Sequence, residues 1–318
     1  MKKSIYVLFI AAILLFTAAC GSTEENEGSS DVEKENTSPE TITVKHELDE
    51  TEVPKNPQKV VVFDFGILDT LDKLGVNVAG VPQSGTIPSY LEKYASDEYE
   101  NVGGLKEPDF EKIAEINPDL IIISGRQAEL YDQFSEIAPT IHLGVDTTRY
   151  MDSFKENMNM VGDIFDKQEE IESGLADIDE SIAALHEKAS ASDKNALIIL
   201  ANDDKIGAYG TNSRFGLIHD VFGVKPVDES IEASTHGMNV SFEYVMEQDP
   251  DLLYVIDRGA VVGGESSAKQ LVENQLVENT KAFKNDNIYY LDPEYWYLSG
   301  GGLQSVAEMV KEIDATIK

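Results

Sequence analysis

The sequence predicts an α/β protein in which two lobes with mostly parallel sheets are joined by one long backbone helix. Three observations support this fold class: apolar strands are entered from helices, one helix–strand unit recurs 132 positions later, and a proline-free helical pattern separates the two copies. Short, continuously apolar strands that alternate with helices are typical of parallel sheets buried on both faces.

The first lobe contains two such units. Residues 60–63 (VVVF) predict an apolar strand, and residues 67–71 continue as an amphipathic helix. Residues 110–116 have helical spacing and end just before Pro118, because proline cannot continue a helix. The run 120–123 (LIII) then predicts a fully buried strand.

The second unit recurs in the second half of the chain. Residues 242–258 carry the same residue as 110–126 at several corresponding positions. The matching residues are Phe110, Glu111, Glu115, Pro118, Asp119, Leu120 and Arg126 in the first copy, and Phe242, Glu243, Glu247, Pro250, Asp251, Leu252 and Arg258 in the second. A shorter echo pairs FGIL at 65–68 with FGLI at 215–218. We therefore predict two homologous lobes.

Between the two copies, residues 151–190 carry apolar side chains at helical spacing and contain no proline. The predicted domains are therefore an N-terminal α/β lobe at 42–150, a linking helix at 151–190 and a C-terminal α/β lobe at 191–318. A continuous linking helix would span about 60 Å, more than the width of one lobe. Two shorter helices broken near Asp166 or Gly174 are the alternative.

The first residues of the chain predict an export signal. Lys2 and Lys3 precede an apolar run at 5–16, which is too short to span a bilayer comfortably. The segment TAAC at 17–20 resembles the lipobox of bacterial lipoproteins. An ordinary cleaved signal that ends near an incidental cysteine is the alternative.

This resemblance implies a signal peptide at 1–19 and a lipid on Cys20, which becomes the first residue of the mature chain. Residues 20–41 are polar and lack apolar periodicity, so we expect a flexible tether. The predicted location is the extracytoplasmic face of a Gram-positive type of cell membrane, with the protein lipid-anchored.

Composition excludes several classes of function. The chain has 59 acidic and 25 basic side chains and a formal charge of -34, whereas nucleic-acid-binding surfaces are basic. A single cysteine excludes a disulfide framework. The five histidines lack metal-ligand spacing, and no HExxH, GxSxG or Walker A motif is present. We therefore predict no catalytic residues, no metal ligands and no enzymatic activity.

The four arginines are the most informative residues. Arg126 and Arg258 directly follow equivalent strands of the two lobes, and ligands of open α/β sheets bind at the carboxyl ends of strands. Arg214 lies in a loop that leads into a helix. If the lobes face each other, these three guanidiniums converge on a binding site for an anion. Pairing with nearby carboxylates, such as Asp257, is the alternative, and Arg149 is interpreted as a surface residue.

Other candidate ligand contacts carry weaker signals. Trp296 and Tyr297 lie in an aromatic loop that either stacks on an aromatic ligand or anchors a lid on the core. His236, in Thr235-His236-Gly237, is a candidate for the mouth of the cleft.

The chain resembles the class III periplasmic-type solute-binding proteins, and within them the Bacillus-type petrobactin (catecholate siderophore) binding lipoproteins. The resemblance covers about residue 42 to the end. It rests on the stretches KVVVFDFG at 59–66, LKEPDF at 105–110, SRFGLIHD at 213–220 and WYLSGGG at 296–302. It implies the class III fold, with two Rossmann-like lobes on either side of a long helix and little closure between them.

The resemblance also implies a function and its partners. In this group an arginine triad holds a ferric chelate, which implies that Arg126, Arg214 and Arg258 bind an Fe(III)-siderophore and that no other cofactor is needed. It implies that Glu111 and Glu243 dock on an ABC permease, and that the protein acts as a monomer. A hydroxamate siderophore, haem or a corrinoid is the alternative ligand. A surface-anchored enzyme is the alternative from another class.

Overall fold

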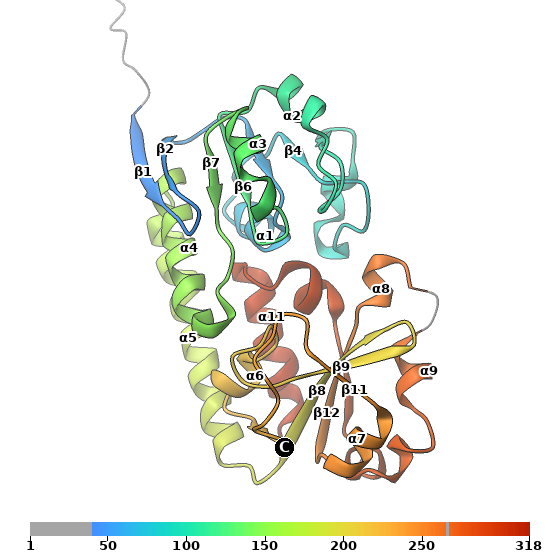
Figure 1. The fold of residues 1–318 in the computed structure, drawn as a ribbon. Coiled ribbons are helices and arrows are strands. Elements are labelled where there is room, and N and C mark those ends of the chain that lie inside the picture. Colours follow the sequence, from blue (N-terminus) through green and yellow to red (C-terminus); the bar gives the residue numbers. More distant parts are fainter. Residues whose placement is uncertain (1–39, 265–266) are drawn as a thin grey trace, which may run out of the picture. The chain divides into compact units, whose positions relative to one another are not determined.

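The computed structural model describes residues 40–264 and 267–318, in which two α/β lobes are stacked along one long helix (Figure 1). The predicted signal peptide at 1–19, the lipidation site Cys20 and nearly all of the predicted tether at 20–41 lie outside the described residues. Within the described part, no helix is long and apolar enough to cross a membrane.

The N-terminal lobe is built on a parallel sheet of five strands in the order β5-β4-β3-β6-β7. The strands are β3 (Val60–Val62), β4 (Gly80–Val81), β5 (Glu100–Asn101), β6 (Leu120–Ile123) and β7 (Thr140–His142). The helices are α1 (Phe65–Lys73), α2 (Phe110–Ile116) and α3 (Tyr131–Ser135), with short 3₁₀ turns at Ser89–Ala95, Ala128–Leu130 and Thr147–Arg149.

Both faces of this sheet are covered, which explains its continuously apolar strands. Val60 and Val62 face the core shared with α1, whereas Val61 and Phe63 face a second cluster with Phe110 and Phe134 from α2 and α3. Successive side chains of a strand point to opposite faces, so both sets must be apolar. The predicted strands at 60–63 and 120–123 are confirmed.

The C-terminal lobe is built on a mixed sheet in the order β11-β9-β8-β12-β13, with β10 also paired to β8. Its strands are β8 (Asn195–Asn202), β9 (Lys205–Tyr209), β10 (Lys225–Pro226), β11 (Met238–Val240), β12 (Leu252–Asp257) and β13 (Ile288–Leu291). The β8–β12, β12–β13 and β8–β10 pairs are parallel, and β9 is antiparallel to both of its neighbours.

The helices of this lobe are short except for the last one. They are α6 (Leu217–Asp220), α7 (Phe242–Gln248), α8 (Gly259–Val262), α9 (Ala268–Val272), α10 (Lys281–Lys284) and α11 (Leu303–Thr316). A 3₁₀ turn spans Val277–Asn279, and a π-helical turn, Glu294–Ser299, leads into α11. Ile198 and Tyr254 extend the large core of the N-terminal lobe, while Leu197 and Leu253 face a separate cluster on the other side of the sheet.

The predicted repeat has the same local structure in both lobes. Helices α2 and α7 begin after the capping residues Asp109 and Ser241, whose side chains accept backbone N–H bonds. Both helices end at a residue with left-handed backbone, Asn117 (φ 50°) and Asp249 (φ 45°), and a proline follows each. The sharp stop directs the chain into the parallel strands β6 and β12.

The segment between the lobes consists of two helices, α4 (Tyr150–Phe165) and α5 (Gln168–Ser190), so the prediction of one uninterrupted helix over 151–190 is wrong. The break falls at Asp166, which adopts left-handed backbone (φ 51°, ψ 48°), as in the two-helix alternative. Asp166 accepts bonds from Asn56 and Lys55, which compensates for this conformation. The chain reverses there, and α5 alone is the long helix that runs alongside both lobes (Figure 1).

A hairpin precedes the first lobe. It consists of β1 (Thr41–Lys45) and β2 (Glu50–Pro54), which pair antiparallel. The hydroxyl of Thr51 donates to the carbonyl of Thr140 at 2.9 Å, which attaches the hairpin to β7. Glu47, at the tip of the hairpin, lies 3.8 Å from His142, the last residue of that strand.

Helix α11, the last element of the chain, is capped by a helix of the other lobe. Asp69 of α1 is fully buried and accepts bonds from the backbone N–H groups of Gln304 (3.2 Å) and Ser305 (3.0 Å). The hydroxyl of Thr70 accepts from the N–H of Leu303 at 3.0 Å. The first turn of α11 has no intrahelical partners for these groups, so α1 satisfies them and joins the lobes.

Candidate functional site

A cavity of about 1320 Å³ lies between the two lobes. Its walls include residues that follow the strands of both sheets, among them Asp64 after β3, Ser124 after β6, Leu143 after β7 and Arg258 after β12. The carboxyl ends of parallel strands are where open α/β sheets bind ligands. The prediction of a cleft between facing lobes is therefore confirmed in its geometry.

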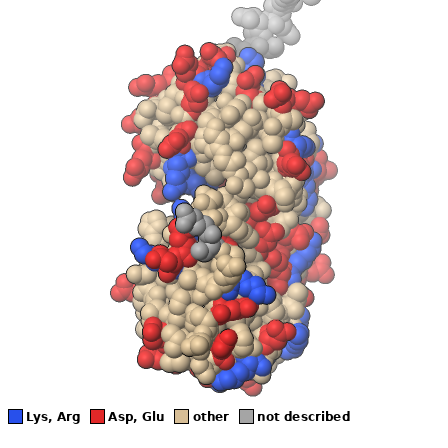
Figure 2. Space-filling model, turned by 90° about the vertical axis from the view of Figure 1, so that its right-hand side faces the viewer, with Lys and Arg blue, Asp and Glu red and all other residues tan. Residues whose placement is uncertain are grey.

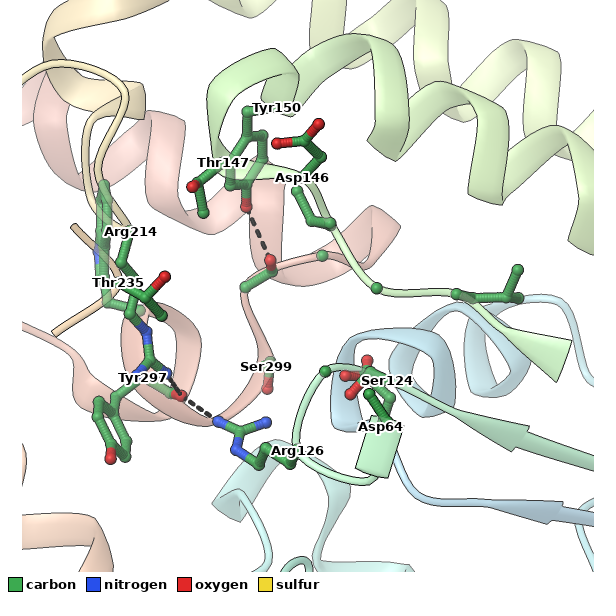
Figure 3. Close-up of a pocket in the computed structure, with 18 of the residues that line it drawn as sticks. Asp64, Ser124, Arg126, Asp146, Thr147, Tyr150, Arg214, Thr235, Tyr297 and Ser299 are labelled. Atoms are coloured by element: carbon green, nitrogen blue, oxygen red, sulfur yellow. Dashed lines mark hydrogen bonds between the residues drawn. The ribbon is translucent and has the colours of Figure 1, made fainter. Parts of the chain in front are cut away.

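The three predicted arginines meet at one residue of this cavity, Tyr297. Arg126 donates to the Tyr297 carbonyl at 2.6 Å and Arg214 donates to the same oxygen at 2.8 Å (Figure 3). Arg258 donates through Nε to the Tyr297 hydroxyl at 2.9 Å. The Arg214 guanidinium lies over the Tyr297 ring, 4.2 Å from its centroid. The structure thus brings together three residues that are 44 to 132 positions apart.

None of these three guanidiniums has a carboxylate oxygen within 4.0 Å in the part of the chain that the structure describes. Asp257, the alternative partner of Arg258, instead accepts from the N–H groups of Ala260 and Ala268. Arg149 does pair with a carboxylate, that of Glu156, and both side chains are exposed. The arginines of the cleft therefore differ from the surface arginine in having neutral partners only among the described residues.

The cluster raises the electrostatic energy of its own members. Burial lowers the pKa of Arg214, and the charge of Arg126 lowers it further. Burial also raises the pKa of the Tyr297 phenol, but the hydrogen bond from Arg258 and the nearby charge of Arg214 outweigh burial, so the net pKa is lowered. An anion in the cavity would relieve the repulsion among the guanidiniums.

The other predicted ligand contacts, Tyr297, His236 and Trp296, line the same cavity but differ in how far their side chains are exposed to it. Tyr297 presents its ring to the arginines, and His236 is exposed on the loop before β11. Trp296 is only 3% exposed, and its indole N–H donates to Glu312 at 2.6 Å. Trp296 thus packs on the core under the cavity, which agrees with the lid-anchor alternative for the aromatic loop.

The predicted docking residues lie away from the cavity. Glu111 and Glu243 are exposed in the first turns of α2 and α7, at equivalent positions of the two lobes. Acidic side chains are scattered over both lobes on the face drawn in Figure 2, so exposure and charge alone do not single these two out.

Several cavity residues were missed by sequence analysis. Glu47 at the tip of the hairpin, Asp64 and His142 line the N-terminal side of the cavity. Asp64 and His142 could have been found, because each occupies the end of an apolar strand, the position that singled out the arginines. Among the described residues, no group of histidine, cysteine or acidic side chains is arranged to hold a metal ion.

A family model described as periplasmic binding protein matches residues 60–295, which include both sheets and the cavity. The chain belongs to this family. Two relatives of the chain are named for the siderophore that they bind. The petrobactin-binding protein YclQ of Bacillus subtilis is 55% identical and aligns over 98% of each chain. The ferric-anguibactin-binding protein FatB of Vibrio anguillarum is 32% identical over 86% of each chain.

Solved structures of periplasmic binding proteins share the fold. The crystal structure of YclQ matches with a TM-score of 0.85 and 57% identity, covering 88% of this chain and 99% of that one. The catecholate-siderophore binding protein VctP of Vibrio cholerae matches with a TM-score of 0.83 and 34% identity, covering 87% and 100%. The predicted class III fold, with its long helix between two α/β lobes, is confirmed.

Proposed function

We propose that this chain is an extracytoplasmic binding protein that captures an anionic ferric siderophore, of the catecholate or petrobactin type, and delivers it to an ABC importer. The observation that carries the proposal is the cluster of Arg126, Arg214 and Arg258 around Tyr297, without carboxylate partners among the described residues. The names of the relatives YclQ and VctP support the same ligand class.

The charge of such a ligand matches the cluster. Three catecholates supply about six negative charges to Fe³⁺, a hard ion that prefers oxygen, and about three remain on the complex. Three guanidiniums neutralise this charge and donate to the oxygens of the chelate. Hydroxamate complexes are close to neutral and would leave the repulsion within the cluster in place. The ligand supplies all the oxygens around iron, so the protein contributes no metal ligand.

The remaining parts of the proposal concern transport. Cys20 would carry the lipid that holds the protein at the outer face of the cell membrane, and the protein would act as a monomer that binds without chemical turnover. Glu111 and Glu243, one on each lobe, would contact the permease. Trp296 lies beneath the ligand and Tyr297 and His236 beside it.

Binding measurements on arginine variants test the function. We expect wild type to bind ferric petrobactin far more tightly than a ferric hydroxamate. Arg126→Ala, Arg214→Ala and Arg258→Ala should each lose about 1.5–3 kcal/mol, the range for hydrogen bonds to charged groups. Arg149→Ala is the matched control, because it removes an exposed arginine that is paired with Glu156. Calorimetry gives the affinities, and quenching of the single tryptophan gives an independent readout.

Two outcomes would contradict the proposal. Equal affinity for hydroxamate and catecholate complexes would show that the three guanidiniums do not select the ligand by its negative charge. A triple arginine variant with wild-type affinity would show that the cluster does not hold the chelate.

A further inference from the structure

The N-terminal side of the cavity contains a buried histidine whose ring nitrogens can accept a hydrogen bond from a ligand or donate one to it. His142 ends β7 and is 5% exposed, yet neither of its ring nitrogens has a hydrogen-bond partner among the described residues. Buried polar groups in native proteins are almost always hydrogen-bonded, so an unpartnered imidazole calls for an explanation. In the described part, the only side-chain nitrogen or oxygen that is both enclosed and unpartnered is Nδ1 of His46. The nitrogens of His142 therefore open to the cavity that it lines.

The chain around His142 is shaped to keep its ring in place. A side chain at Gly144 would approach the imidazole to 2.6 Å at Cε1 and 2.9 Å at Nε2, so only glycine leaves room for this orientation. Burial lowers the pKa of His142 more than the charges of Glu47 and Asp64 raise it. The ring is accordingly neutral at neutral pH and offers one nitrogen as an acceptor.

Two carboxylates face the same space. Nδ1 of His142 lies 3.8 Å from Oε2 of Glu47, which is too far for a direct hydrogen bond. Asp64 is 8% exposed, and both backbone bonds that it accepts, from Gly66 and Ile67, go to Oδ1. Its Oδ2 has no partner among the described residues and, like the imidazole, reaches the cavity.

Glu47 is held over β7 by a network in the hairpin. The ring of the neighbouring residue, His46, contacts the hydroxyl of Thr51 through Nε2 at 3.1 Å and packs edge-on against Tyr131. Thr51 in turn donates to the carbonyl of Thr140, two residues before His142. The hairpin tip is therefore fixed relative to the imidazole.

This cluster is separate from the arginines. In Figure 3, Asp64 and Ser124 lie on the opposite side of Arg126 from Tyr297. Glu129 and Asp146 add negative charge to the cavity wall and Lys106 adds one positive charge. The cavity thus offers positive charge at Tyr297 and hydrogen-bond acceptors with negative charge beyond Arg126.

We propose that Glu47, Asp64 and His142 form a second subsite that binds a protonated amine of the siderophore. An ammonium group donates several hydrogen bonds and carries the charge that two carboxylates and a neutral imidazole attract. The ligand is then an amphoteric molecule, with an anionic ferric centre at the arginines and a cationic arm in this subsite. The inference rests on the proposed function and narrows its ligand class.

Two ferric tris-catecholate complexes that differ only in the linker of one arm test this subsite, because the ligand then fills every position on iron. One linker contains a secondary amine, and in the other the same nitrogen is acetylated and uncharged. We expect wild type to prefer the amine complex by about tenfold or more, the factor for one charge-assisted hydrogen bond. Glu47→Gln, Asp64→Asn and His142→Phe should each lose most of this preference. Their affinity for the acetylated complex should change little.

The variants are chosen to preserve the fold. Asparagine at 64 keeps an oxygen for the N–H groups of α1, and phenylalanine at 142 keeps a planar ring against Gly144. Glu52→Gln removes an exposed carboxylate of the same hairpin outside the cavity and should behave as wild type. Arg126→Ala should weaken both complexes alike.

The outcomes separate the two proposals. If wild type binds both complexes equally well and the three variants follow it, the amine subsite is wrong while siderophore binding stands. If wild type binds neither complex nor ferric petrobactin, the proposed siderophore-binding function is wrong, and the amine subsite that rests on it is wrong as well.

Discussion

Tyr297 is the residue on which the site depends, because it separates three positive charges that would otherwise repel one another. Its carbonyl accepts from two guanidiniums, its hydroxyl accepts from a third, and its ring lies under one of them. A carbonyl oxygen and an aromatic face both attract cations. Tyr297 therefore gives the three guanidiniums neutral hydrogen-bond partners at the place where we propose that the anionic chelate binds.

The phenol of Tyr297 should reveal this environment in a titration. Its pKa is lowered, whereas burial raises the pKa of Tyr209 to about 12 and also raises that of Tyr254. In the absence of ligand, we expect tyrosinate absorbance to show one tyrosine that ionises below the ordinary pKa of about 10. Tyr297→Phe should remove that step and Arg258→Gln should move it to higher pH. An unchanged titration in Tyr297→Phe would show that the arginines do not act on this phenol.

At the scale of single residues, the sequence was enough to predict the three arginines of the cavity. It was not enough to predict that the carbonyl of Tyr297 would bring two of them together. Arg126 and Arg258 stand out because each directly follows a strand of the repeated unit. The carbonyl that gathers Arg126 and Arg214 belongs to a π-helical turn, and no residue type marks where a backbone oxygen will point. Residue type alone left open whether Trp296 stacks on a ligand or anchors the loop, because only the fold brings its indole N–H to Glu312 in the core.

At the scale of elements, α1 and α11 are joined by a carboxylate that takes the place of a local helix cap. Burial raises the pKa of Asp69 to about 7, and the bonds from Ser305 and Gln304 oppose this shift only in part. The glycine at 302 is required because a side chain there would overlap Asp69 and the carbonyl of Gly66. The backbone of Gly301 and Gly302 is thus a packing surface for α1.

The protonation of Asp69 should appear in the pH dependence of stability. The folded protein keeps the proton up to about pH 7, whereas the unfolded chain loses it near pH 4. The folded state binds more protons in between, so this carboxyl makes the free energy of unfolding fall as pH rises through that window. Relative to Asp69→Asn, wild type should lose up to about 1.4 kcal/mol per pH unit there, measured by urea unfolding.

Asp163→Asn removes an exposed carboxylate of α4 and serves as the control for this comparison. Parallel curves for wild type and Asp69→Asn between pH 4 and pH 7 would show that the helix N-terminus keeps Asp69 ionised in the folded protein.

The two helices between the lobes show where pattern reading fails. The apolar spacing at 151–190 continues across the break because α4 and α5 bury their faces in the same core. Gly162 marks the close approach of the two helices, since a side chain there would lie 3.3 Å from the backbone of Gln168. The turn itself depends on a single aspartate with left-handed backbone, which carries little signal in a sequence.

At the scale of the whole molecule, one core continues through both lobes. It includes Val60 of the first sheet, Ile198 of the second, and residues of α4, α5 and α11 between them. The division into lobes was predictable from the repeat, but this shared core was not, because periodicity shows which face is buried and not what covers it. Such a core favours small closure on binding over a wide hinge.

A nearly rigid pair of lobes would hold the proposed docking residues at a fixed separation. We expect Glu111→Ala combined with Glu243→Ala to abolish iron uptake by cells that depend on this protein, while affinity for ferric petrobactin stays unchanged. Glu115→Ala with Glu247→Ala, on the same two helices, is the matched control. Uptake of radioactive iron and calorimetry on the purified variants measure the two effects. Normal uptake with the Glu111 and Glu243 variant would place the permease contact elsewhere.

The bonds between α1 and α11 also set an order of events in folding. Thr70 and Asp69 reach partners 233 to 236 positions later in the chain, and no nearer N–H group replaces them among the bonds of the described residues. Contacts so distant in sequence form late, since a long loop must close first. The first lobe therefore cannot complete its own polar interior until α11 packs against α1. Without α11, the hydroxyl of Thr70 at 3.3 Å is the one donor to Asp69 that remains among the bonds of the described residues.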